Sequence, residues 1–172
     1  YLNSRQGPVF DKGRTLYGYH LAKQNIKEIG AVVVEGYMDA LIAHQEGFSN
    51  VVASMGTSLT KHQAKLLQDV TKEVVLALDP DTAGQEATLR SLESSWQVLQ
   101  RRIVSQTRGP TLYERPKGPT LKVAPLPQGM DPDEIILENP TLWEQLTKDA
   151  VPLMAFLFQA LSTRFDLSTS QG

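Results

Sequence analysis

The sequence contains no cysteine, which excludes disulfide bridges and thiolate metal sites within its 172 residues. No apolar stretch approaches the roughly 20 residues that a membrane-spanning helix needs. The N-terminus has no start methionine and no apolar core of a signal peptide, so we expect an excised piece of a longer chain. A net charge of −2 argues against a uniformly basic nucleic-acid-binding surface, although it allows local basic patches.

Two short apolar runs in this chain end in acidic residues. Residues 31–34 (AVVV) are followed by Glu35 and, four residues later, Asp39, while residues 74–78 (VVLAL) are followed by Asp79 and Asp81. Short β-branched runs of this kind are typical of strands buried on both faces of a parallel sheet. Ligands in such sheets bind outside the carboxyl ends of the strands, so the acids would reach one edge together.

Helical and strand patterns alternate along the first hundred residues. We expect strands at 31–34, 50–53 and 73–78, and helices at 12–29, 38–46, 60–69 and 82–99. Gly30 is expected to cap the end of the first helix and Thr60 the start of the third. This alternation predicts right-handed βαβ units and a Rossmann-like α/β fold, with a parallel sheet flanked by helices. Gly-Pro pairs mark residues 105–120 as a loop or hairpin, and strand pieces are expected at 103–104 and 121–124.

The last part of the chain is predicted to be a small C-terminal helical subdomain. Pro132 fits the first turn of a helix capped by Asp131, Pro140 begins another helix, and residues 152–164 carry an apolar stripe. We therefore divide the chain into 1–30 (a linker and first helix), 31–128 (the sheet domain with an insertion at 105–120) and 129–172.

Carboxylates that converge on one edge repel one another unless a hard cation neutralises them. Mg²⁺ with a phosphate-bearing substrate is the usual partner of such a cluster, and Asp79 and Asp81 are spaced to bridge divalent cations. Each motif also has a purely structural alternative. Asp-Pro-Asp is a good turn sequence, while Asp39 and Asp131-Pro132-Asp133 can simply cap helices.

Lys12 and Arg14 lie at the expected start of the first helix, where the helix dipole disfavours cations. The mismatch suggests that the two side chains have another role, such as binding nucleotide phosphate. Without support from other motifs, a solvated basic pair is the simpler interpretation.

Several motifs together resemble the TOPRIM module of bacterial DNA primases (DnaG-type). The resemblance rests on YLNS at 1–4, FDKGRTLYG at 10–18, VVEGYMDA at 33–40, VASMGTSLT at 52–60, LDPDTAG at 78–84 and LPQGMDPDE at 126–134. It covers nearly all of residues 1–160, apart from 105–120.

The resemblance implies a nucleotidyltransferase that synthesises short RNA primers on single-stranded DNA for replication. It implies Mg²⁺ as cofactor, with Mn²⁺ as the alternative, and zinc only in a module outside this piece. The implied partners are the DNA template, ribonucleoside triphosphates, the RNA primer and, in the intact protein, the replicative helicase. The implied location is the cytoplasm, without membrane contact, and we expect the isolated piece to have little or no activity.

The resemblance also assigns roles to individual residues. Glu35 is the implied catalytic acid and a metal ligand, with Asp79 and Asp81 as the other ligands and Asp39, Asp131 and Asp133 as supporting acids. Nucleotide binding falls to Lys12, Arg14 and Asn3.

The sequence departs from the family pattern at two places. Pro80 stands where the family usually has glycine, and proline fixes φ and removes an N–H donor. The 105–120 excursion is longer than the usual connection. Other readings are another TOPRIM protein (a topoisomerase or OLD-type nuclease), a haloacid-dehalogenase-like phosphatase, and a non-enzymatic DNA-binding scaffold.

Overall fold

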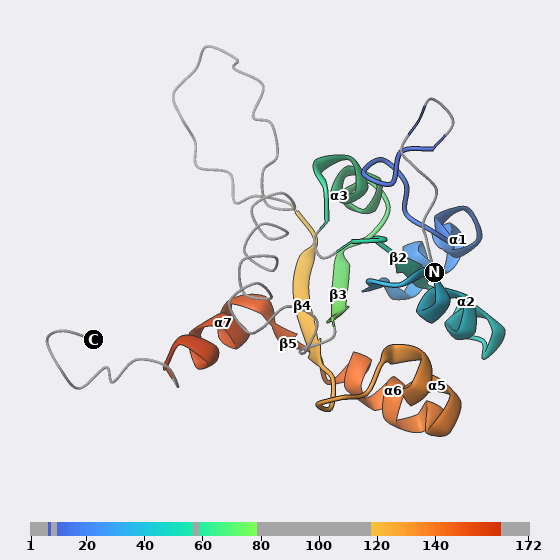
Figure 1. The fold of residues 1–172 in the computed structure, drawn as a ribbon. Helices are drawn as coiled ribbons and strands as arrows, with labels where there is room; N and C mark the ends of the chain where they lie inside the picture. Colours follow the sequence, from blue (N-terminus) through green and yellow to red (C-terminus); the bar gives the residue numbers. More distant parts are fainter. Residues whose placement is uncertain (1–6, 8–9, 57–58, 79–117, 163–172) are drawn as a thin grey trace, which may run out of the picture.

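The computed structural model describes residues 7, 10–56, 59–78 and 118–162, and the fold is given for these residues (Figure 1). In chain order the elements are α1 (Tyr19–Ile29), β1 (Ala31–Val34), α2 (Tyr37–Gln45), β2 (Val51–Ala53), α3 (Lys61–Gln68), β3 (Glu73–Leu78), β4 (Thr120–Pro125), α5 (Pro132–Glu138), α6 (Pro140–Lys148), β5 (Val151–Pro152) and α7 (Leu153–Ser162). None of the described helices is long and apolar enough to cross a membrane.

The strands form one sheet in the order β2-β1-β3-β4-β5, which confirms the predicted α/β class. Four strands are parallel: β1 pairs with β2 and β3, and β3 pairs with β4. The predicted strands at 31–34 and 73–78 have the observed bounds, and the one at 50–53 is shorter by a residue. Alternating hydrophobic strands joined by helices therefore specified the parallel part of the sheet.

The fifth strand is a feature that the sequence patterns did not predict. Val151 and Pro152 pair antiparallel with Val123 and Lys122 of β4, whereas the apolar stripe had placed residue 152 inside the last helix. Proline is compatible with an edge strand because one side of such a strand needs no ladder donor. The final helix consequently begins at Leu153.

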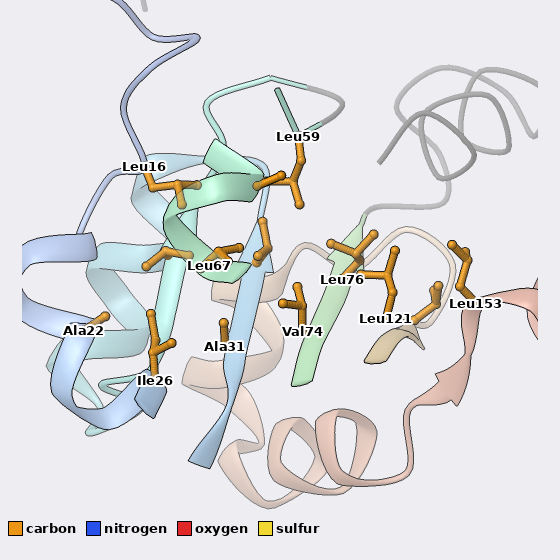
Figure 2. Packing of buried hydrophobic residues seen from close by; sticks show 14 residues of the cluster. Leu16, Ala22, Ile26, Ala31, Leu59, Leu67, Val74, Leu76, Leu121 and Leu153 are labelled. Carbon is orange, nitrogen blue, oxygen red and sulfur yellow. The ribbon is translucent and has the colours of Figure 1, made fainter. Parts of the chain in front are cut away.

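Buried side chains alternate between the two faces of the sheet, as the pleat requires. Val33, Val52, Val74 and Leu76 pack with α1, α3 and the start of α7 on one face. Figure 2 shows Val74 and Leu76 of this cluster. The other face carries Val32, Val34, Val51 and Val75 and packs with α2, α5 and α6. All four residues of β1 are buried, as expected for a strand covered on both sides.

The first helix is shorter than the sequence predicted, beginning at Tyr19 instead of Lys12. Gly18 adopts φ 78°, a left-handed conformation that interrupts the helical pattern. Before it, Tyr17 forms an antiparallel bridge with Ala53, with N–H to O distances of 2.9 and 3.1 Å. The preceding residues are thus used to cover the outer edge of β2, and Lys12 and Arg14 are not at a helix terminus.

Other local predictions agree with the structure. Thr60 is the N-cap of α3 and accepts a hydrogen bond from the backbone N–H of Gln63 at 3.2 Å. Asp131 is the N-cap of α5, whose first residue is Pro132. Gly30, with φ 91°, ends α1 as predicted.

The predictions that fall outside the described residues are the helix at 82–99, the strand piece at 103–104 and most of the excursion at 105–120. The loop that contains Pro80 also lies outside them. The division at 30/31 and 128/129 stays a prediction. Both buried clusters cross these positions, however: Leu16 and Leu153 share one cluster, and Val34 and Trp143 share the other.

Candidate functional site

The carboxyl ends of the four parallel strands lie at one edge of the sheet. In the order β2-β1-β3-β4 the chain runs from β1 outward to β2 and then returns to place β3 on the other side of β1. The junction of β1 and β3 is therefore the topological switch point, where parallel sheets bind ligands. Glu35 follows β1 directly at this point, and β3 ends there at Leu78. Asp79 and Asp81 lie outside the described residues, so their metal role stays a prediction.

The backbone of Glu35 is held by the loop that follows β2. The N–H of Ser54 donates to the carbonyl of Val34 at 3.0 Å, and the N–H of Met55 donates to the carbonyl of Glu35 at the same distance. Met55 has φ 56° and is the one residue other than glycine with positive φ in the described part of the chain. Strained backbone of this kind persists where surrounding contacts enforce it, and it occurs often at functional sites.

Gly36 leaves space for the Asp39 carboxylate and does not form a sharp turn. Its φ of −87° and ψ of 142° are open to any residue, but a Cβ added at this position would lie 2.8 Å from Oδ2 of Asp39. The N–H of Gly36 donates to the same Oδ2 at 3.1 Å. Glycine thus lets the Asp39 carboxylate lie directly against the backbone beside Glu35.

Asp39 is also where the acids of α2 and α5 meet. The pKa of Asp39 is raised to about 6, mainly by burial and in addition by the negative charges of Asp133 and Asp131. Hydrogen bonds from the backbone N–H groups of Gly36 and Asp133 oppose this shift only partly. The structure therefore brings three of the predicted acids, Asp39, Asp131 and Asp133, close enough for their charges to interact.

Lys12 and Arg14 lie near the same edge in a tight turn of residues 11–15, called the basic turn below. The N–H of Gly13 donates to Oδ1 of Asp11 at 2.9 Å, and the N–H of Arg14 donates to the carbonyl of Asp11 at 3.0 Å. Lys12 and Arg14 are exposed to solvent. Asn3, the third predicted nucleotide-binding residue, lies outside the described residues.

The donor set favours a hard cation, because carboxylate oxygens suit Mg²⁺ and neither cysteine nor histidine is among the predicted ligands. The raised pKa of Asp39 fits a site that gains from a positive charge. Within the described ranges, no group of three or more His, Cys, Asp or Glu side chains is arranged to hold a metal ion.

One residue of this region was missed by the sequence analysis. Gln63 is fully buried in α3, and its side chain donates to backbone carbonyls in both the basic turn and the loop after β2. The signal was present, because a threonine N-cap followed three residues later by glutamine is the pattern of a capping box. The helix start was predicted from Thr60 alone, and the capping-box pattern would not have predicted the tertiary contacts of the glutamine amide.

Known proteins similar to this chain point to one family. A family model described as Toprim-like matches residues 32–110. The DNA primase of Clostridium acetobutylicum is 37% identical over 173 residues, and that of Escherichia coli K12 is 37% identical over 174. Both alignments include the whole of this chain, which spans 26% and 27% of those proteins.

Solved structures give the same answer for the fold. A DnaG primase catalytic domain bound to single-stranded DNA has a TM-score of 0.78 and 37% identity, covering 100% of this chain and 50% of its own. The E. coli primase catalytic core has a TM-score of 0.77 at 37% identity, with the same two coverages. Family model, sequence and fold agree over the region that carries Glu35: residues 32–110 are a Toprim-like region, and the whole chain is similar to part of the DnaG primase catalytic core.

Proposed function

We propose that this chain is part of a primase that synthesises short RNA primers on single-stranded DNA by metal-dependent nucleotidyl transfer. The observation that carries the proposal is the position of Glu35 at the switch point of a sheet whose whole sequence aligns with DNA primases. The DNA-bound catalytic domain that resembles this chain supports a DNA template as partner.

We assign Glu35 the role of catalytic acid and metal ligand, with Asp79 and Asp81 as the remaining ligands. A bound pair of divalent cations, Mg²⁺ by preference, would activate the primer 3′-hydroxyl and neutralise the incoming triphosphate. Glu35 orients the reacting groups from a backbone fixed by Met55. Asp39, Asp131 and Asp133 are proposed to act as supporting acids, because the repulsion among their negative charges favours the binding of cations nearby.

Lys12 and Arg14 are proposed to bind the phosphates of the ribonucleoside triphosphate, together with Asn3. Both described side chains are exposed on a turn whose backbone is fixed. The remaining proposed partners are the growing RNA primer and, in the intact protein, the replicative helicase, with the cytoplasm as the place of action. Within the chain, we propose residues 31–128 as the TOPRIM unit and 129–172 as its helical extension.

Substitution of Glu35 by glutamine in the full-length protein tests the proposal. The change keeps the size of the side chain and removes its charge, so we expect primer synthesis on single-stranded DNA to fall by about 10²-fold or more. The matched control is Glu46→Gln at the far end of α2, which leaves the edge of the sheet untouched. Undiminished primer synthesis by the Glu35→Gln enzyme would remove the catalytic assignment of Glu35.

A further inference from the structure

Gln63 is a polar side chain in the middle of an apolar cluster. It has 0% exposure, and Ser54 is the one other buried polar residue in the described part of the chain. Its neighbours in α3, Ala64 and Leu67, are ordinary core residues. An amide in such a place is retained only where its hydrogen bonds are satisfied, so its partners indicate its role.

The amide nitrogen of Gln63 faces three backbone carbonyls. Nε2 lies 3.0 Å from the oxygen of Lys12, 2.9 Å from that of Thr15 and 2.9 Å from that of Ser54. The two amide hydrogens are thus shared among three acceptors that belong to two separate segments. Oε1 accepts from the N–H of Thr60 at 2.9 Å, which fixes the orientation of the amide group.

Thr60 provides a second anchor to the same turn. Its hydroxyl donates to the carbonyl of Gly13 while accepting from the N–H of Gln63. Three carbonyls of the basic turn, those of Lys12, Gly13 and Thr15, are therefore held by two side chains at the start of α3. With the carbonyls held inward, the side chains of Lys12 and Arg14 are exposed.

The third acceptor connects the turn to the catalytic edge. Ser54 begins the loop whose N–H groups donate to the carbonyls of Val34 and Glu35. One amide therefore contacts both the segment that carries Lys12 and the segment that holds the backbone of Glu35. Neither link follows from the sequence spacing, since the hydrogen-bonded residues are 51, 48 and 9 positions apart.

We propose that Gln63 is a positioning residue that fixes the basic turn relative to the end of β1. Part of this inference rests on the proposed function, namely that the turn binds nucleotide phosphate. The structural part, that Gln63 holds the turn, stands independently of any activity. An apolar side chain of equal length would fill the same space, so packing alone does not require an amide here. The amide is explained by its hydrogen bonds to the two segments that it joins.

Gln63→Met in the full-length protein tests the structural part. Methionine keeps the length and removes all four hydrogen bonds of the amide, so the turn should open more often. Trypsin cleaves after lysine and arginine, and we expect cleavage after Lys12 and Arg14, followed by mass spectrometry, to be about tenfold faster. Ala64→Gly is the matched control, because it weakens the same helix without touching these bonds and should leave the two cleavage rates nearly unchanged. Equal cleavage of Gln63→Met and wild type would overturn the proposal.

The link to nucleotide binding has its own readout. A loosened turn should raise the KM for ribonucleoside triphosphates several-fold, with a smaller fall in kcat, whereas general destabilisation lowers the amount of active enzyme without moving KM. Faster cleavage with an unchanged KM would keep Gln63 as the anchor of the turn and overturn the assignment of nucleotide binding to Lys12 and Arg14. An inactive Glu35→Gln enzyme remains a separate test of the function itself.

A second variant keeps the inference testable should Gln63→Met not fold. Thr60→Val removes the hydroxyl that donates to Gly13 but leaves the amide of Gln63 in place. We expect a smaller increase in cleavage after Lys12 and Arg14 than for Gln63→Met. No increase in the Thr60→Val protein would contradict anchoring of the turn by the start of α3.

Discussion

At the scale of single residues, Asp39 shows how the site accommodates opposing requirements. Its carboxylate accepts a hydrogen bond from Gly36 in a space that a Cβ would occupy, yet burial and the charges of Asp133 and Asp131 disfavour its ionisation. A group chosen only for stability would be neutral in this position. The acid is explained if the local negative charge is used to attract cations.

This conflict predicts a specific pH dependence. The folded-state pKa of about 6 lies above the ordinary value of 3.8, so the folded protein binds the proton more tightly than the unfolded chain does. The free energy of unfolding should therefore fall as pH rises between about 4 and 6. Asp39→Asn removes this dependence, and at pH 7 without divalent cations it should be more stable than wild type by about 1–2 kcal/mol, after allowance for partial exposure of the side chain.

Urea unfolding of the two proteins over a pH series measures the difference. The difference in free energy of unfolding between Asp39→Asn and wild type should be near zero at pH 4 and reach its full size above pH 6. Adding Mg²⁺ at pH 7 should reduce this stability difference by stabilising the wild type, because a bound cation neutralises the carboxylates. Parallel stability curves for the two proteins would show that Asp39 does not titrate in this range.

At the scale of elements, α5 and α6 decide where Asp133 lies. Trp143 of α6 is 1% exposed and packs edge-on against Phe48, with ring centroids 6.4 Å apart and planes inclined by 67°. Ile135 and Ile136 of α5 belong to the same cluster. Figure 1 shows α5 and α6 side by side. Their packing against α2 brings Asp133 to Asp39.

Trp143→Ala should therefore destabilise the protein strongly. Loss of a fully buried indole and the cavity left behind cost about 3–5 kcal/mol in chemical unfolding. Leu137→Ala in α5 is the control, since that side chain is 58% exposed and its removal should cost less than about 0.5 kcal/mol. Similar costs for the two variants would mean that α6 is not part of the cooperative core.

At the scale of the whole molecule, residues early and late in the chain together form the two buried clusters, one on each face of the sheet. β5 extends the sheet beside β4, and α5 and α6 cover a face that would otherwise expose Val34, Val75 and Ala77. The helical part after residue 128 thus shares its buried clusters with the sheet, although the Toprim-like family model matches only residues 32–110.

Truncation after residue 128 tests this view. The shortened chain would lose β5, α5, α6 and α7, leaving one face of the sheet largely uncovered. We expect it to lose its cooperative thermal transition and to bind a hydrophobic dye, because a sheet with an exposed apolar face is not stable alone. A truncated chain that unfolds at the same temperature as the parent would instead make residues 129–172 a separate unit.

The hydrophobic pattern determined most of the described fold by itself. Runs such as 31–34 and 73–78 predicted strands buried on both faces, and Thr60, Asp131 and Gly30 marked helix ends correctly. These signals are local, because they depend on residues two to four positions apart. The same pattern, with the family motifs, led to Glu35 at the edge of a parallel sheet.

Only the tertiary structure decided which distant segments meet there. In the tertiary structure the first helix begins only after Gly18, so that Tyr17 pairs with Ala53, and β5 forms from residues with no strand signal. The approach of Asp133 to Asp39 and the contacts of Gln63 with the basic turn likewise come from packing of elements far apart in the sequence. Local sequence patterns cannot encode such contacts, because their energies arise only when the whole sheet and both helical layers are assembled.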